Sequence, residues 1–291
     1  YKYIPHGVSK LFKPLPSDDQ KLVEFKERYG LNEYDFVVLW NNRNIRRKVP
    51  GDVILSFNEF AKQSQDKKVC LFLHTQRSDD NGTDLNEVIK WNAEYGDYKF
   101  TDARFTTEDL NLFYNSGDII LNIASNEGFG LASCEALRAG TPIVVNVTGG
   151  LQDQCGFDYT ADDYIEIGSL HDKKRFGDTP SGEWVIPVWS SASNINGSVM
   201  TPYIFDDRVN DYDVANAIFE FYNMGRDVRK EKGLKGREWA INEAGFTGET
   251  QGKRVIEAFD ELFSTWKPRE KYELINTNEA KDRVINNKLL Y

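Results

Sequence analysis

The chain has 291 residues, of which 40% are hydrophobic and 13% aromatic, and this composition excludes a disordered or fibrous protein. Lys and Arg number 36 against 46 Asp and Glu, and the net charge of −10 disfavours a protein that coats nucleic acid or anionic lipid. No apolar run approaches the roughly 18 residues that a membrane-spanning helix needs.

Three cysteines, Cys70, Cys134 and Cys155, form no Cys-x-x-Cys pair, and an odd, sparse set does not indicate a disulfide framework. We therefore expect a protein of the reducing cytoplasm. The chain starts at Tyr1 without an initiator Met or a charged-then-apolar leader, and we expect that a segment upstream has been removed.

Short apolar runs alternate along the chain with segments of helical periodicity, as in a parallel sheet covered by helices on both faces. The runs are almost wholly apolar, which favours strands buried on both sides. We predict an α/β fold, a Rossmann-like doubly wound parallel sheet. The predicted strands are 35–40, 69–74, 118–123 and 142–146, and the predicted helices between them are 51–64, 84–94, 107–115 and 130–139.

The pattern weakens after residue 150. Residues 151–205 hold many Gly, Ser, Asn and Asp, and we predict an elaborated loop region there. Helical periodicity resumes in three segments, 212–223, 227–243 and 248–264, and a polar tail follows at 266–291.

A basic run follows the first predicted strand. Arg43, Arg46, Arg47 and Lys48 place four cations within six residues of an acidic protein. In an open α/β sheet, ligands bind beyond the carboxyl ends of the strands, so this loop is a candidate for anion binding. A solvated surface cluster is the alternative explanation for such a run.

A glycine-rich turn follows the predicted strand 118–123. Gly128 and Gly130 precede a helix, where free N–H groups and the helix dipole attract phosphate. Glu127 precedes the helix and Glu135 lies one to two turns into it, so both carboxylates can face one pocket at different heights. Tight turns also use Gly-x-Gly, and Glu135 alone could simply be exposed.

The sequence E-G-F-G-L-x-x-x-E-A-L-x-x-G-T-P-I-V, which starts at Glu127 and continues to Gly149-Gly150, resembles retaining glycosyltransferases of the GT-B fold, the glycosyl transferases group 1. Their E-x7-E spacing is met by Glu127 and Glu135. Their Arg and Lys, five residues apart, are met by Arg43 and Lys48, and their hinge sequence is met by residues 4–8 and 12–14. The resemblance covers residues 4–150 and points to the C-terminal, donor-binding domain.

This resemblance implies a role for each matched residue. Arg43 and Lys48 would hold the diphosphate of a nucleotide-sugar such as a UDP-, GDP- or ADP-sugar. Glu135 would accept hydrogen bonds from the ribose hydroxyls, and Glu127 would contact the transferred sugar. The amides of Gly128, Phe129, Gly130 and Leu131 would assist at the diphosphate.

The chain also departs from the family pattern. Asn42 stands where the family usually has Gly, and the connection at 151–205 is longer than usual. We expect the neighbouring Arg46 and Arg47 to be mainly solvated.

We expect neither a metal nor another cofactor. The sequence Asp211-Tyr212-Asp213 is better explained as the cap of a helix than as a metal site. His6, His74 and His171 show no ligand spacing, and a backbone hydrogen bond in the hinge is a better expectation for His6 than catalysis. Fixed cations and a helix terminus can neutralise the leaving diphosphate instead.

The resemblance also predicts the organisation of the chain. Residues 1–34 would be the hinge and lead-in from a missing N-terminal acceptor domain, 35–265 the nucleotide-sugar-binding domain, and 266–291 a C-terminal tail. The leading function is a retaining hexosyl-type glycosyltransferase that moves a sugar to an unknown glycan, lipid or protein acceptor, with this chain as its donor-binding part.

Other functions share this fold. One alternative is a donor-binding or regulatory subunit without activity of its own. A continuous reading frame upstream of Tyr1 that encodes another Rossmann-like unit would favour the enzyme instead. A nucleotide-sugar epimerase would act on the donor without an acceptor. A sugar phosphorylase would need a lysine for pyridoxal phosphate, and no local context singles one out.

Overall fold

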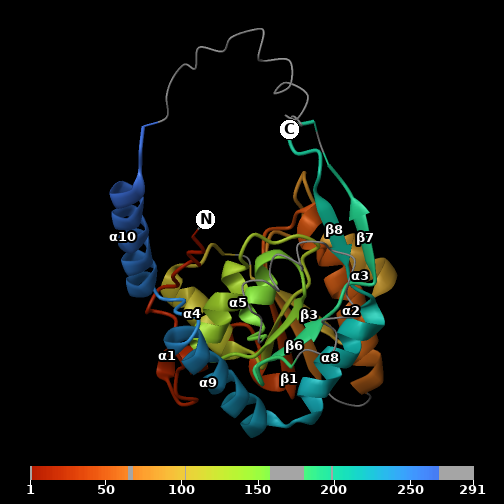
Figure 1. The fold of residues 1–291 in the computed structure, drawn as a ribbon. Coiled ribbons are helices and arrows are strands. Elements are labelled where there is room, and N and C mark those ends of the chain that lie inside the picture. Colours follow the sequence, from red (N-terminus) through yellow and green to blue (C-terminus); the bar gives the residue numbers. More distant parts are fainter. Residues whose placement is uncertain (1, 65–67, 102, 158–179, 198, 269–291) are drawn as a thin grey trace.

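The computed structural model describes residues 2–64, 68–101, 103–157, 180–197 and 199–268, and centres on a six-stranded parallel sheet (Figure 1). Its strand order, β3-β2-β1-β4-β5-β6, runs outward in both directions from β1 and β4, as in a doubly wound fold. The strands are β1 (Phe36–Asn41), β2 (Val69–His74), β3 (Asp97–Phe100), β4 (Ile119–Asn122), β5 (Ile143–Asn146) and β6 (Val185–Val188).

Helices cover both faces of the sheet. Side chains alternate along β1, so that Val37 and Leu39 join one apolar cluster while Phe36 and Val38 join the other. The first cluster packs under α1 (Gln20–Arg28), α4 (Thr107–Ser116), α5 (Leu131–Ala139) and α9 (Arg226–Asn242). The second packs under α2 (Pro50–Ser64), α3 (Leu85–Asn92) and α8 (Asp211–Asn223).

These elements confirm the predicted fold class and its four predicted strands. The prediction of a loop over 151–205 is wrong for residues 185–188, which form β6, and for 192–195, which form β7 (Ala192–Ile195). β7 pairs with β8 (Phe205–Arg208) in an antiparallel hairpin. Residues 158–179 of the predicted loop lie outside the described part of the chain.

Two more elements were not predicted. β3 is an edge strand, and α1 forms within the predicted lead-in. Asp19 caps α1 by accepting a hydrogen bond from the Leu22 N–H, and Phe25 packs edge-on against Phe72 of β2. At least this part of residues 1–34 therefore packs onto the sheet domain.

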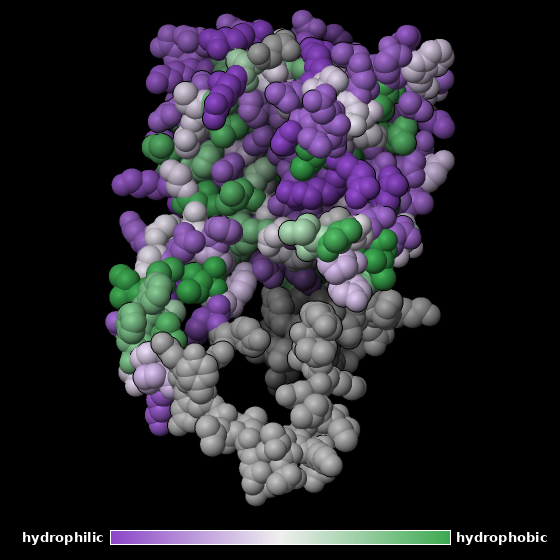
Figure 2. Space-filling view, turned by 90° about the horizontal axis from the view of Figure 1, so that it is seen from above, coloured by the Kyte–Doolittle hydropathy of each residue, from purple (hydrophilic) through white to green (hydrophobic). Residues whose placement is uncertain are grey.

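The last described helix, α10 (Gly248–Thr265), has no buried residue. Figure 1 shows it on the flank opposite the β7–β8 hairpin, and Figure 2 shows hydrophobic residues gathered on that side. Its exposed apolar side chains are Ile256, Phe259, Leu262 and Phe263, with Trp266 just beyond. Among the residues described, no helix is both long and apolar enough to cross a membrane. Most of the predicted tail, from residue 269 onward, lies outside the described residues.

Candidate functional site

The loop after β1 turns sharply before α2 begins. It forms a short 3-10 helix at Arg46–Lys48, and Val49 then adopts a left-handed backbone with φ of 44°. Such a conformation is strained for a β-branched residue. The buried Asn44 fastens this loop to the one after β2, because its Nδ2 donates to the carbonyls of Gln76 and Thr83. The basic run is therefore held in place.

The glycine-rich turn before α5 is packed against the start of residues 149–154. Gly130 has φ of 84°, and α5 begins after it with no side-chain cap, which leaves the amides of its first turn available. A Cβ on Gly149 would lie 2.1 Å from the Glu127 carbonyl oxygen, and one on Gly150 would lie 2.2 Å from that of Gly128. The turn can approach this closely only because both positions are glycine.

The basic loop and the glycine-rich turn meet at Glu127. Lys48 Nζ and Arg47 Nη1 both contact Glu127 Oε2, the latter at 3.0 Å. Lys48 is buried, and burial lowers its pKa, while the hydrogen bond with Glu127 acts in the opposite direction. Arg47 is exposed, as expected, but its guanidinium is ordered by the protein, since it also donates to the Asn126 carbonyl at 3.0 Å.

Glu135 lies on α5, which packs against α4, β4 and β5. The hydroxyl of the fully buried Tyr114 donates to Glu135 Oε2 at 2.6 Å, and Asn41 Nδ2 donates to the same hydroxyl at 2.6 Å. Burial raises the pKa of the Glu135 carboxyl, and the hydrogen bond from Tyr114 opposes that rise. Among the described residues, nothing donates to the other oxygen of this carboxylate, Oε1, which remains available to a hydroxyl donor.

Lys48, Glu127 and Glu135 line a cavity of about 400 Å³ at the carboxyl ends of β1 and β4. Glu127 and Glu135 share it, as predicted, but Arg43 does not line it. His6 of the expected hinge also lines it, with its ring edge-on to Phe129 at 5.2 Å. The predicted site residues that line it are Lys48, Glu127, Phe129, Gly130, Leu131 and Glu135.

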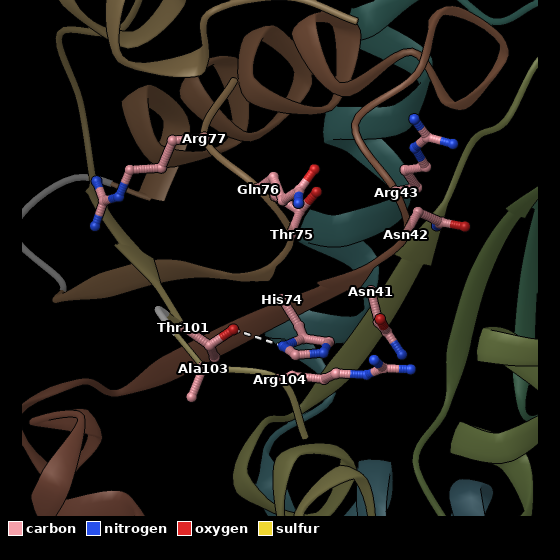
Figure 3. A pocket seen from close by; sticks show the side chains of 10 residues that line it. All are labelled: Asn41, Asn42, Arg43, His74, Thr75, Gln76, Arg77, Thr101, Ala103 and Arg104. Carbon is pink, nitrogen blue, oxygen red and sulfur yellow. Dashed lines mark hydrogen bonds between the residues drawn. The ribbon is translucent and has the colours of Figure 1, made fainter. Parts of the chain in front are cut away.

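Arg43 lines a second, larger cavity of about 830 Å³ at the ends of β1 and β2 (Figure 3). Its guanidinium forms two hydrogen bonds with the Asp79 carboxylate, at 2.8 and 3.2 Å. Figure 3 shows it turned away from His74, while Arg104 extends past His74 toward Asn41. Asn41 and Asn42 line both cavities, which are therefore adjacent.

His74 forms part of the floor of the second cavity. Its Nδ1 lies 2.5 Å from Thr101 Oγ1, and its ring stacks on Phe105 with centroids 4.3 Å apart. Burial lowers the pKa of His74, which favours a neutral ring. The sequence offered no spacing that would have placed His74 or Arg104 at a site.

Within the described residues, no group of three or more His, Cys, Asp and Glu side chains is placed to hold a metal ion. The predicted cap at Asp211 is wrong by one residue. Asn210 caps α8 by accepting from the Tyr212 N–H, and Asp211 and Asp213 lie in the first turn, where their charge suits the helix dipole.

The sequence and the fold are similar to those of known glycosyltransferases. Residues 23–160 match the family described as Glycosyl transferases group 1. The alpha-monoglucosyldiacylglycerol synthase of Acholeplasma laidlawii is 26% identical over 149 residues, which are 50% of this chain and 35% of that protein.

Solved structures share the fold at low sequence identity. Sucrose-phosphate synthase from Thermosynechococcus elongatus has a TM-score of 0.60 and 18% identity over 91% of this chain and 53% of its own. A glycosyltransferase from Rickettsia africae has a TM-score of 0.60 and 16% identity, and the match covers 90% of this chain and 57% of that one. Anabaena HepE in complex with UDP and glucose has a TM-score of 0.60 and 15% identity, and the match covers 90% of this chain and 57% of that one. The chain thus spans about half the length of these structures and about a third of the curated relative.

Proposed function

From the premise that residues 23–160 belong to glycosyl transferases group 1, we propose that this chain is the donor-binding part of a retaining hexosyl-type glycosyltransferase. Its donor is a nucleotide-sugar, and its acceptor site lies on another part of the whole protein. A related structure supports the choice of donor, since HepE was solved in complex with UDP-glucose. We place the protein in the cytoplasm, in keeping with its sparse, unpaired cysteines.

The observation that carries this proposal is the meeting of Lys48, Glu127 and Glu135 in one cavity at the start of α5. A nucleotide-sugar presents a pair of ribose hydroxyls and a diphosphate that gains negative charge as it leaves. Glu135 accepts from the hydroxyls through its free oxygen, and the uncapped amides of α5 face the diphosphate. Lys48 adds positive charge where the sugar–phosphate bond breaks.

Glu127 contacts the transferred sugar in this proposal. Its carboxylate opens into the same cavity and is already held by two cations. Held in this way, it can accept hydrogen bonds from sugar hydroxyls without turning toward the solvent. It also places negative charge beside the oxocarbenium-like centre that develops as the bond breaks.

Arg43 requires a change of partner to act on the diphosphate. In the structure its planar fork is matched to the Asp79 carboxylate. A phosphate group offers the same two-oxygen geometry, so the side chain can exchange one anion for the other. We assign Arg43 to the diphosphate, provided that its guanidinium exchanges Asp79 for the phosphate when the donor binds.

Calorimetric titration of this chain with UDP, GDP and ADP tests the proposal and identifies the base. We expect saturable binding of at least one of them, which Glu135→Ala weakens. The absence of binding to all three would refute the donor site. In the full-length protein, product analysis with donor alone distinguishes transfer from epimerisation, because an epimerase converts the nucleotide-sugar without an acceptor.

A further inference from the structure

Arg47 joins the basic loop to the glycine-rich turn through both its main chain and its side chain. Its carbonyl accepts from the Ser125 N–H at 2.8 Å and from Ser125 Oγ at 3.2 Å. Its Nη1 donates to the Asn126 carbonyl and to Glu127 Oε2, both at 3.0 Å. These four contacts fall on three consecutive residues, the last of which is Glu127.

Glu127 Oε2 has two cationic partners of different kinds. The Lys48 side chain is 9% exposed and lines the cavity, whereas the Arg47 side chain is 46% exposed and does not line it. Lys48 therefore lies where a ligand can reach it, and Arg47 approaches the same oxygen from outside the cavity.

Glu127 needs at least one of its two cations, Lys48 or Arg47, once the donor binds. If Lys48 turns toward the diphosphate, as the proposed function requires, Glu127 loses one of its two cations. A carboxylate that is 10% exposed and has no partner is strongly disfavoured. Arg47 is the cation that remains on it, and its second contact, to the Asn126 carbonyl, keeps the guanidinium in place.

We propose that Arg47 is a positioning residue, which holds Glu127 toward the transferred sugar while Lys48 leaves it for the diphosphate. This inference rests on the proposed function. Arg47 acts through Glu127 and not on the donor itself, so its loss lowers the rate of transfer more than the affinity for free nucleotide.

The adjacent Arg46 supplies a matched control. It belongs to the same 3-10 turn and is exposed, and within the described residues its side chain forms no ion pair or hydrogen bond. Replacement of either arginine removes the same charge from the same loop, but only Arg47 touches Glu127.

The experiment compares Arg46→Ala, Arg47→Ala and Arg47→Lys in the full-length protein, with turnover at saturating donor and calorimetric affinity for the nucleoside diphosphate. We expect Arg47→Ala to lower kcat by about 10- to 100-fold, as for loss of one ordering electrostatic contact, and to change nucleotide affinity by less than about threefold. Arg47→Lys should recover part of kcat, and Arg46→Ala should stay within about twofold of the parent. A kcat for Arg47→Ala equal to that of Arg46→Ala would overturn the inference, as would a loss of nucleotide affinity as large as the loss of kcat.

A double-mutant cycle in urea separates this inference from the proposed function, because it needs no nucleotide. Arg47→Ala should lower the unfolding midpoint in the parent and have less effect when Glu127→Gln is present. Equal effects in both backgrounds would overturn the inference, even in a protein that binds nucleotide. Failure of the parent to bind any nucleoside diphosphate refutes the proposed function instead.

Discussion

The Tyr114 hydroxyl donates to Glu135 Oε2 across 2.6 Å and anchors one oxygen of a carboxylate that lies in the floor of the candidate site. The other oxygen remains available to a ligand. Burial raises the pKa of this carboxyl, so its charged form is retained at a cost to the fold.

Glu135→Gln should therefore stabilise the protein at neutral pH. The pKa of Glu135 is higher in the folded protein than in the unfolded one. The parent protein therefore has its full stability below the unfolded pKa of this carboxyl and loses part of it as pH rises through the folded pKa. The stability gained by the variant should be absent near pH 4 and should grow as pH rises through the folded pKa of Glu135. Urea unfolding of both proteins between about pH 4 and 8 measures this difference, with the exposed Glu220→Gln as control. A difference of the same size at every pH would contradict the assigned burial cost.

The two cavity carboxylates should have separable effects. Glu135→Ala should weaken binding of a nucleoside diphosphate by about 1.5–3 kcal/mol, the usual value of a charged hydrogen-bond partner. Glu127→Gln should not weaken that affinity and should instead lower turnover of the full-length protein. Calorimetry measures the nucleotide affinity, and donor turnover measures the rate of transfer. Equal losses of nucleotide affinity in both variants would mean that the ribose and sugar contacts are assigned to the wrong carboxylates.

Arg43 and Asp79 should have opposite effects on nucleotide binding. Arg43→Ala removes the proposed phosphate contact and should lower the affinity, whereas Asp79→Ala frees the arginine from its partner and should raise the affinity a few-fold. Arg43→Lys should be a partial rescue, because lysine supplies charge without the fork. An Asp79→Ala variant that binds more weakly would show that the ion pair shapes the site and does not compete with the ligand.

Two glycines of the site should differ in their tolerance of a methyl group. A Cβ on Gly150 would meet backbone atoms of Gly128 and Phe129 at 2.2 and 2.5 Å, whereas a Cβ on Gly128 has nothing within 4 Å. Gly150→Ala should lower the free energy of unfolding by about 1–3 kcal/mol, as overpacking does, and Gly128→Ala should change it little. Urea unfolding decides, and equal stability of the two variants would contradict the described packing of the turn.

Nucleotide binding should not require a divalent metal. Cations of the chain and the start of α5 can neutralise the phosphates. Titration of one nucleoside diphosphate with and without a chelator should give affinities that agree within about twofold. A strict need for magnesium or manganese would make Asp211 and Asp213 metal-ligand candidates again.

The fold could be predicted where burial leaves a strong pattern in the sequence. β1, β2, β4 and β5 are covered on both faces and consist almost wholly of apolar residues. β3 and β6 are the two edges of the sheet, and their sequences carry less of this signal. Asp97 and Lys99 interrupt the first, and Pro187, which an edge strand tolerates, interrupts the second.

The candidate site could be predicted only as far as spacing determines position. The spacing of Glu127 and Glu135 on and before one helix placed both in one cavity. Spacing along an irregular loop does not determine which way each side chain points. Arg47 therefore contacts Glu127, although the motif singled out Arg43, and Asp79, which holds Arg43, lies 36 positions away with no pattern to connect them.

The pairing of Arg43 and Lys48 with carboxylates of their own chain also bears on how salt would affect the site. In a protein with a net charge of −10, these cations exert little attraction on an approaching anion from a distance. A ligand must exchange with an internal carboxylate, and few dissolved counterions are released when it does. Binding would therefore vary weakly with ionic strength, and abundant small anions such as chloride would compete poorly with a ligand that can replace both of these contacts at once.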